Sequence, residues 1–166
     1  MIGNSSRAPR NVWTRTRSWL DNSKRYLRIS DVPVSARVNS ILAISPEEED
    51  YRGLRELFAP SHWNLQQSHT RQEALSLLKT SVVPVVVSEQ DLPDGNWKNV
   101  QADLQQLPGP PLLVVASRVA DERLWLEVLE SGGFDVLVKP WGREEVRRVI
   151  ASALQQFGSR CSCYTG

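Results

Sequence analysis

The sequence predicts a doubly wound α/β domain, in which helices cover both faces of one five-stranded parallel sheet. Three observations predict this class. Between residues 39 and 157, five short apolar runs alternate with segments of helical periodicity. Most of the apolar runs are continuous, as is typical of parallel strands buried on both faces. Pro, Gly and helix-capping residues separate the two kinds of segment, which is the pattern of repeated strand–helix units.

The first strand is expected at residues 40–44, Ser-Ile-Leu-Ala-Ile. A helix is expected directly after it, with Ser45 as the N-cap, Pro46 at the first helical position and Glu48 completing a capping box. The apolar stripe of this helix consists of Leu54, Leu57 and Phe58. With this capping role, Ser45 needs no catalytic explanation.

The middle of the chain contains the strongest strand signal. A weak strand at residues 63–67 precedes a helix that starts at a second capping box, residues 70–73. Residues 82–87, Val-Val-Pro-Val-Val-Val, predict a buried third strand. Residues 92–95, Leu-Pro-Asp-Gly, form a turn, and a helix is expected over residues 97–107.

The last third of the chain repeats the alternation twice. A fourth strand is expected at residues 111–116 and a helix at residues 121–129. A Gly-Gly pair at residues 132–133 breaks the chain. The fifth strand is expected at residues 134–138, and the closing helix at residues 143–157.

The ends of the chain differ in composition from this predicted domain. The first 40 residues contain eight basic and two acidic side chains, whereas the remainder contains 12 basic and 17 acidic ones. We therefore expect residues 1–38 to form a mostly disordered basic arm, with a short helix over residues 15–28. Residues 158–166 are expected to form a flexible tail, which leaves residues 39–157 as the domain.

Several classes of protein are disfavoured. No apolar run approaches the roughly 20 residues that a membrane-spanning helix needs, and no secretory signal begins the chain, so a cytoplasmic location is expected. Cys161 and Cys163 form an isolated Cys-x-Cys, whereas a structural zinc site needs four ligands. We expect no metal site there.

Function is expected at the carboxyl ends of the strands, because ligand chemistry in open parallel sheets collects at that edge. The first strand is followed by Ser45-Pro46, and the third by Glu89 with a Pro-Asp-Gly turn at residues 93–95. The fourth ends at Ala116, and the fifth is followed by Lys139-Pro140.

This ordered set resembles the receiver domain of two-component response regulators. The most specific features are the acid at position 89, four residues before the turn at 93–95, and Lys139-Pro140 after the fifth strand. The resemblance covers residues 39–157. It implies a CheY-like, flavodoxin-like (βα)5 fold with strand order 2-1-3-4-5. It also implies a role in bacterial phosphorelay signalling, with a histidine kinase or a downstream regulator as partner.

Receivers accept a phosphoryl group on an aspartate, with magnesium held by that aspartate and by an acidic pair. Here the acidic-pair positions fall on Ser45 and Pro46, and the phospho-acceptor position falls on Glu89. Of the two phosphoryl-contact positions, one falls on Ala116 and only Lys139 is unchanged. The resemblance thus implies a degenerate pseudo-receiver: we expect no magnesium or other cofactor and no enzymatic activity, but a domain that binds a protein partner.

Glu89 and Lys139 are left facing each other, and we expect them to form an ion pair in a partly buried cleft. One hypothesis is that Glu89 imitates the phosphorylated state; the alternative is an ordinary solvated acid. The candidates for the partner face are Val136, Trp141 and Trp125, of which Trp141 could equally pack on the core.

Two alternatives remain, and a third is disfavoured. The chain could be a receiver that is still phosphorylated in an altered way. The basic arm could bind nucleic acid, with Trp13, Trp19 and Tyr26 stacking on bases. A flavodoxin-type cofactor is disfavoured, because residues 45–50 are acidic and would repel its phosphate.

Overall fold

The structure, a computed structural model, describes residues 39–162, and it describes side chains through residue 160. The strands of the main sheet are β1 (Ser40–Ile44), β2 (Asn64–Ser68), β3 (Val85–Glu89), β6 (Leu112–Ser117) and β7 (Asp135–Val138). A two-stranded hairpin is formed by β4 (Asp91–Leu92) and β5 (Gly95–Asn96). The helices are α2 (Glu48–Phe58), α3 (Arg71–Thr80), α4 (Trp97–Leu104), α5 (Glu122–Glu130) and α6 (Arg143–Ser162).

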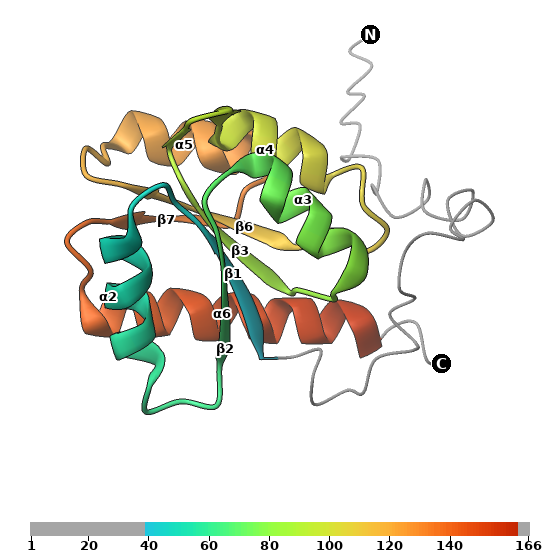
Figure 1. The fold of residues 1–166 in the computed structure, drawn as a ribbon, viewed down its shortest axis with the longest axis horizontal. Coiled ribbons are helices and arrows are strands. Elements are labelled where there is room, and N and C mark those ends of the chain that lie inside the picture. Colours follow the sequence, from blue (N-terminus) through green and yellow to red (C-terminus); the bar gives the residue numbers. More distant parts are fainter. Residues whose placement is uncertain (1–38, 163–166) are drawn as a thin grey trace, which may run out of the picture.

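The five main strands are parallel and lie in the order β2-β1-β3-β6-β7 (Figure 1). Without the hairpin, this order is 2-1-3-4-5 in chain order, so the predicted fold is confirmed. The chain order reverses at β1, which places the ends of β1 and β3 beside each other. This is the position at which open α/β sheets assemble their functional sites.

Two layers of helices cover the sheet, with α2 and α6 on one face and α3, α4 and α5 on the other (Figure 1). The alternation of side chains along each strand divides the core accordingly. In β1, Ile41 and Ala43 point to the first face, whereas Leu42 and Ile44 point to the second. Burial of both faces explains why the strands read as continuous apolar runs.

The start of α2 differs from the prediction. Ser45 still belongs to the sheet, because its backbone N–H donates to the Ser68 carbonyl at 3.1 Å and so continues the β1–β2 ladder. The helix begins at Glu48 with Glu47 at the N-cap, so the expected roles of Ser45, Pro46 and Glu48 are wrong. Ser45 Oγ instead accepts a hydrogen bond from the Glu47 N–H at 3.1 Å.

Other boundaries also differ. The strand β3 covers Val85–Glu89, so it begins three residues after and ends two residues after the predicted positions. The helix α4 ends at Leu104, three residues before the predicted position. The helix α6 extends to Ser162, so residues 158–162 continue a helix and are not a separate tail. The predicted basic arm and its short helix, together with residues 163–166, lie outside the described residues. Within the described part of the chain, no helix is both long and apolar enough to cross a membrane.

Candidate functional site

Lys139 is at the centre of the candidate site. Its backbone N–H donates to the Ser117 carbonyl at 2.9 Å, which extends the β6–β7 ladder by one residue. Its side chain is only 3% exposed, and Nζ donates to Asp50 Oδ2 at 2.7 Å and to Glu89 Oε2. An ammonium group this deeply buried requires partners of opposite charge, and here it has two.

Asp50 is the member of the site that the sequence analysis missed. It lies in the first turn of α2 and is 5% exposed. Its Oδ2 accepts hydrogen bonds from Lys139 Nζ and from the Ser45 hydroxyl, both at 2.7 Å. A signal was present, since Asp50, Leu54 and Phe58 recur at intervals of four on one helical face and all three are buried. A charged residue on a buried stripe indicates a buried partner.

Glu89 is the last residue of β3, the strand that lies between β1 and β6 in the sheet. Its side chain is 18% exposed, so it is not an ordinary solvated acid. The structure brings it to Lys139, as the sequence predicts. Burial raises the pKa of Glu89 above its ordinary value, and the negative charge of Asp50 adds to this, whereas the bond and charge of Lys139 act in the opposite direction.

The remaining positions of the predicted set contribute no carboxylate. Ser45 donates its hydroxyl proton to Asp50, and Pro46 is exposed in the segment before α2. Ala116 is buried in the core on the side of α2 and α6. The neighbouring Ser117 donates to Gln90 Oε1 at 2.7 Å and accepts from the Val119 N–H at 3.1 Å. Its hydroxyl is therefore engaged with the loops around β6.

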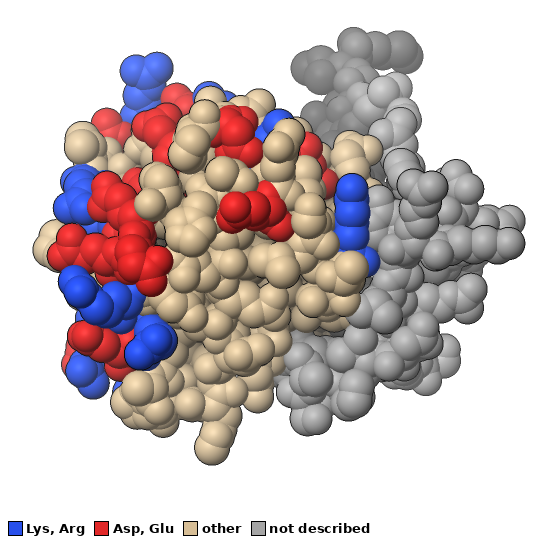
Figure 2. All heavy atoms as spheres, in the orientation of Figure 1, with Lys and Arg blue, Asp and Glu red and all other residues tan. Residues whose placement is uncertain are grey.

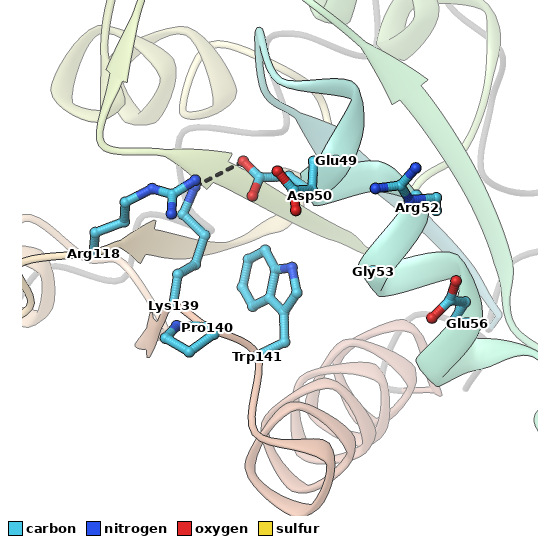
Figure 3. Close-up of a pocket in the computed structure, with 9 residues that line it drawn as sticks. All are labelled: Glu49, Asp50, Arg52, Gly53, Glu56, Arg118, Lys139, Pro140 and Trp141. Atoms are coloured by element: carbon cyan, nitrogen blue, oxygen red, sulfur yellow. Dashed lines mark hydrogen bonds and ion pairs between the residues drawn. The ribbon is translucent and has the colours of Figure 1, made fainter.

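A surface pocket of about 580 Å³ opens between α2 and the loop after β7 (Figure 3). Its lining residues are Glu49, Asp50, Arg52, Gly53, Glu56, Arg118, Lys139, Pro140 and Trp141. Arg118 closes one side through an exposed ion pair with Glu47 at 2.7 Å. Acidic and basic side chains are interspersed along the left edge of the molecule, where α2 begins (Figure 2). The pocket thus has mixed charge.

Trp141 lies against the helix α2. A Cβ atom placed on Gly53 would lie 2.8 Å from Trp141 Cδ1, so the indole ring touches the helix backbone at a position that only glycine leaves open. The ring is half-buried against the core, and its centre lies 5.8 Å from Lys139 Nζ. Of the two roles considered for Trp141, packing on the core is the one that these contacts support.

The other two candidates for the partner face differ from each other. Val136 is 7% exposed and packs in the core beneath α3, α4 and α5, so its expected place on the partner face is wrong. The physical reason is that α5 covers this face of β7. Trp125 is 44% exposed on α5, and its Nε1–H donates to Asp135 Oδ1 at 3.1 Å. Trp125 is therefore accessible.

The donor set does not fit a magnesium site. Magnesium needs carboxylate oxygens that face an open position with room for water ligands. Asp50 and Glu89 are both bonded to Lys139, and Glu47 is paired with Arg118. Within the described residues, no three His, Cys, Asp or Glu side chains group in a way that could hold a metal ion.

Comparison with known proteins finds a distant similarity to a curated regulatory protein. No protein-family profile matches the chain. Over 122 residues it is 25% identical to the KDP operon transcriptional regulatory protein KdpE of Escherichia coli (strain K12). The match covers 74% of this chain and 54% of that protein, so the chain spans about half the length of this relative.

Solved receiver domains have the same fold. The signal receiver domain of an HD domain-containing protein from Pseudomonas fluorescens Pf-5 superposes with a TM-score of 0.69 at 25% identity, over 82% of this chain and 98% of that one. A CheY-like response regulator receiver domain protein from Methanospirillum hungatei JF-1 gives a TM-score of 0.65 at 14% identity, over 74% of this chain and 98% of that one. The second likeness concerns the fold alone. Together with KdpE, these likenesses support a CheY-like receiver domain.

Proposed function

We propose that this chain, a receiver-type domain of two-component signalling, works as a phosphorylation-independent protein-binding module and not as an enzyme. The observation that carries the proposal is the buried triad in which Lys139 bonds both Asp50 and Glu89. Its partner would be a signalling protein, such as a histidine kinase or a downstream regulator, and a cytoplasmic location fits that role.

The charges of the triad argue against phosphoryl transfer at this site. Transfer of a phosphoryl group needs a cation that neutralises the charge of the phosphate oxygens and a nucleophile held in line. Here the single ammonium of Lys139 is already bonded to two carboxylates, so it has no spare positive charge for phosphate oxygens, and the positions after β1 supply only Ser45 and Pro46. We propose that Lys139 takes the place of a divalent cation and that magnesium has no role in this domain.

The triad also supports a single fixed arrangement of the site. Asp50 belongs to α2, Glu89 ends β3 and Lys139 follows β7, so the three side chains join three elements. Because Asp50 holds Lys139 independently of Glu89, the lysine has a strong partner whatever happens at Glu89. This agrees with a domain that presents one constant surface, and in that setting Glu89 would act as a permanent substitute for a phosphorylated residue.

The binding surface that we propose lies on α5 and β7, beside α6. Here the chain exposes Trp125, an aromatic side chain of the kind that anchors protein interfaces. Leu126 and Leu129 of α5 and Val138 of β7 are exposed as well. A patch of this composition on an otherwise well-packed domain is typical of a protein–protein contact.

Intact-mass measurement after incubation with acetyl phosphate and magnesium tests the loss of phosphorylation. We expect no phosphoryl adduct on the wild-type chain. The matched control carries Ser45→Asp, Pro46→Asp and Glu89→Asp, which restore the acidic residue types of a receiver. A phosphoryl adduct on this control variant would show that the three substituted positions account for the loss of phosphorylation. An adduct on the wild-type chain at Glu89 or Asp91 would establish an altered phosphorylation instead and overturn the proposal.

Partner affinity tests the role of Glu89, once a pull-down with mass spectrometry has identified the partner. If Glu89 imitates a phosphorylated residue, Glu89→Gln should weaken binding, because it removes the negative charge with little change in shape. Glu56→Gln, an exposed acid on α2, is the control and should bind like the wild type. Equal affinity of both variants would reject the imitation while leaving the binding module intact.

A further inference from the structure

The exposed large hydrophobic side chains of the described residues all lie in one region. They are Val119, Trp125, Leu126, Leu129 and Val138, and we call this set the α5–β7 patch. Val119 lies in the loop before α5, the next three lie on α5, and Val138 ends β7. Val138 pairs in register with Ser117, which lies two residues before Val119, so the loop and the strand end belong to one surface.

Two contacts fix the direction that this patch faces. Trp125 donates to Asp135, so its flank of α5 faces the edge strand β7. Leu129 lies one helical turn further along the same flank. On the opposite flank, Glu127 forms ion pairs with Lys98 of α4 at 3.1 Å and with Arg123 at 3.3 Å. Trp125 and Leu129 therefore face away from α4, towards β7 at the open edge of the sheet.

Acidic side chains border the patch, and the two arginines beside it, Arg118 and Arg123, are engaged in ion pairs with Glu47 and Glu127. Asp121, Glu122 and Glu130 are exposed at the two ends of α5. Glu122 and Glu130 form no ion pair with any residue that the structure describes. An occupant that matches this surface should therefore carry aromatic and aliphatic side chains together with positive charge.

The same chain contains a segment of this composition. Counted over the first 40 residues, eight basic side chains stand against two acidic ones, whereas the rest of the chain has an excess of five acidic residues. Its apolar residues include Trp13, Trp19, Leu20, Tyr26, Leu27 and Ile29. Its charge is thus opposite to that of the domain, and its apolar residues are of the type that fills such a patch.

We propose that residues 11–30 dock on the α5–β7 patch of their own chain. The connection is long enough: residues 30–39 reach up to about 30 Å when extended. The strands β1 and β7 are three strand spacings apart, about 14 Å. Because tethering makes the contact intramolecular, even a weak contact is well populated. The docked segment covers the surface until a partner displaces it; this last consequence rests on the proposed function, which assigns partner binding to the same face.

Photo-cross-linking in the full chain tests the docking. A benzoylphenylalanine at position 126 should give an intrachain cross-link to peptides from residues 11–30, independent of protein concentration. The matched control places the same probe at Ser152, an exposed residue of α6, and should give no such cross-link. A cross-link that grows with concentration and joins two copies would overturn the proposal, as would the absence of any cross-link to residues 11–30.

A second variant separates this inference from the proposed function. Trp13→Ser with Trp19→Ser should reduce the cross-link several-fold and accelerate amide exchange in α5, while the fold is unchanged by circular dichroism. If the segment regulates access, the same variant should bind the identified partner several-fold more tightly. A lost cross-link with unchanged partner affinity would support the docking and contradict the assignment of partner binding to this face. An unchanged cross-link in the variant would contradict the docking itself.

Discussion

Lys139 Nζ donates to Asp50 Oδ2 across 2.7 Å, although the two residues are 89 positions apart in the sequence. Both side chains are buried, and the same ammonium also bonds Glu89. Removing one partner from a buried ion pair is costly, because the other charge is left without compensation. The stability of the domain should therefore depend on each member of the triad in a distinct way.

The first prediction concerns Asp50→Asn. The amide keeps the shape of the side chain but removes the charge from its hydrogen bonds to Lys139 and Ser45. Because Lys139 retains Glu89, we expect a loss of about 2 to 3 kcal/mol in the free energy of unfolding, the range of one charge-assisted bond. Urea denaturation measures it. Glu49→Gln, at the neighbouring exposed position, should change stability by less than about 0.5 kcal/mol. Similar losses in both variants would contradict this role of Asp50.

The second prediction concerns Lys139→Met, which leaves Asp50 and Glu89 without their cation. We expect a loss of about 3 to 5 kcal/mol at neutral pH. Unpaired buried carboxylates bind protons more readily in the folded than in the unfolded state, so the loss should shrink as the pH is lowered. The freed carboxylates should also gain affinity for Mn²⁺, detectable by electron paramagnetic resonance.

The matched control for this gain is the double variant Lys139→Met with Glu89→Gln. It has the same cavity and one carboxylate fewer, so the Mn²⁺ affinity should fall back towards that of the wild type. If wild-type protein binds Mn²⁺ as tightly as the Lys139→Met variant, Lys139 is not the substitute for a divalent cation.

The third prediction concerns pH. Burial raises the pKa of Glu89 above its ordinary value of 4.5. Folding therefore favours the protonated form, so the contribution of Glu89 to stability is complete below its unfolded pKa and declines as the pH rises through its folded pKa. In urea titrations from pH 4 upwards, wild type should lose stability relative to Glu89→Gln over this window. If the wild type instead gained stability relative to Glu89→Gln as the pH rises, the raised pKa of Glu89 would be refuted.

The fourth prediction uses two glycines in helices. Gly53→Ala would place Cβ 2.8 Å from Trp141 Cδ1, so the indole ring must move. Overpacking costs about 1 to 3 kcal/mol, more than the roughly 1 kcal/mol that alanine contributes within a helix, so we expect net destabilisation. Gly158 in α6 has no atom within 4 Å of the added Cβ, and Gly158→Ala should stabilise by up to about 1 kcal/mol. Thermal unfolding and the indole N–H resonance of Trp141 provide the measurements. Equal effects of the two substitutions would exclude the contact with Trp141.

Much of the fold could be predicted, because apolar runs and turns are local signals. The run at residues 40–44 coincides with β1, and the alternation of strands and helices leads to the observed sheet order. The facing of Glu89 and Lys139 could also be predicted, since parallel strands end at one edge of the sheet.

Asp50 could not be recognised in the same way. The acidic residues at positions 47–50 all suit a helix N-terminus, and in the sequence only the spacing of four to Leu54 and Phe58 distinguishes Asp50 from its exposed neighbours. The burial of Val136 likewise depends on the position of α5 over β7. The start of α2 was misplaced because Ser45 suits an N-cap by composition, whereas its N–H was already bound to β2. The burial of Val136 and the start of α2 depend on tertiary contacts that no sequence window contains.

The placement of the triad has a consequence for folding. Its carboxylates come from the first and middle strand–helix units, whereas its cation arrives only with the segment after the last strand, at Lys139. A partly assembled chain that lacks this segment buries two like charges with nothing between them. The last strand–helix unit therefore supplies the missing positive charge as well as apolar surface. The domain should for this reason unfold as one cooperative unit. A fragment that ends before residue 131 should not stay folded.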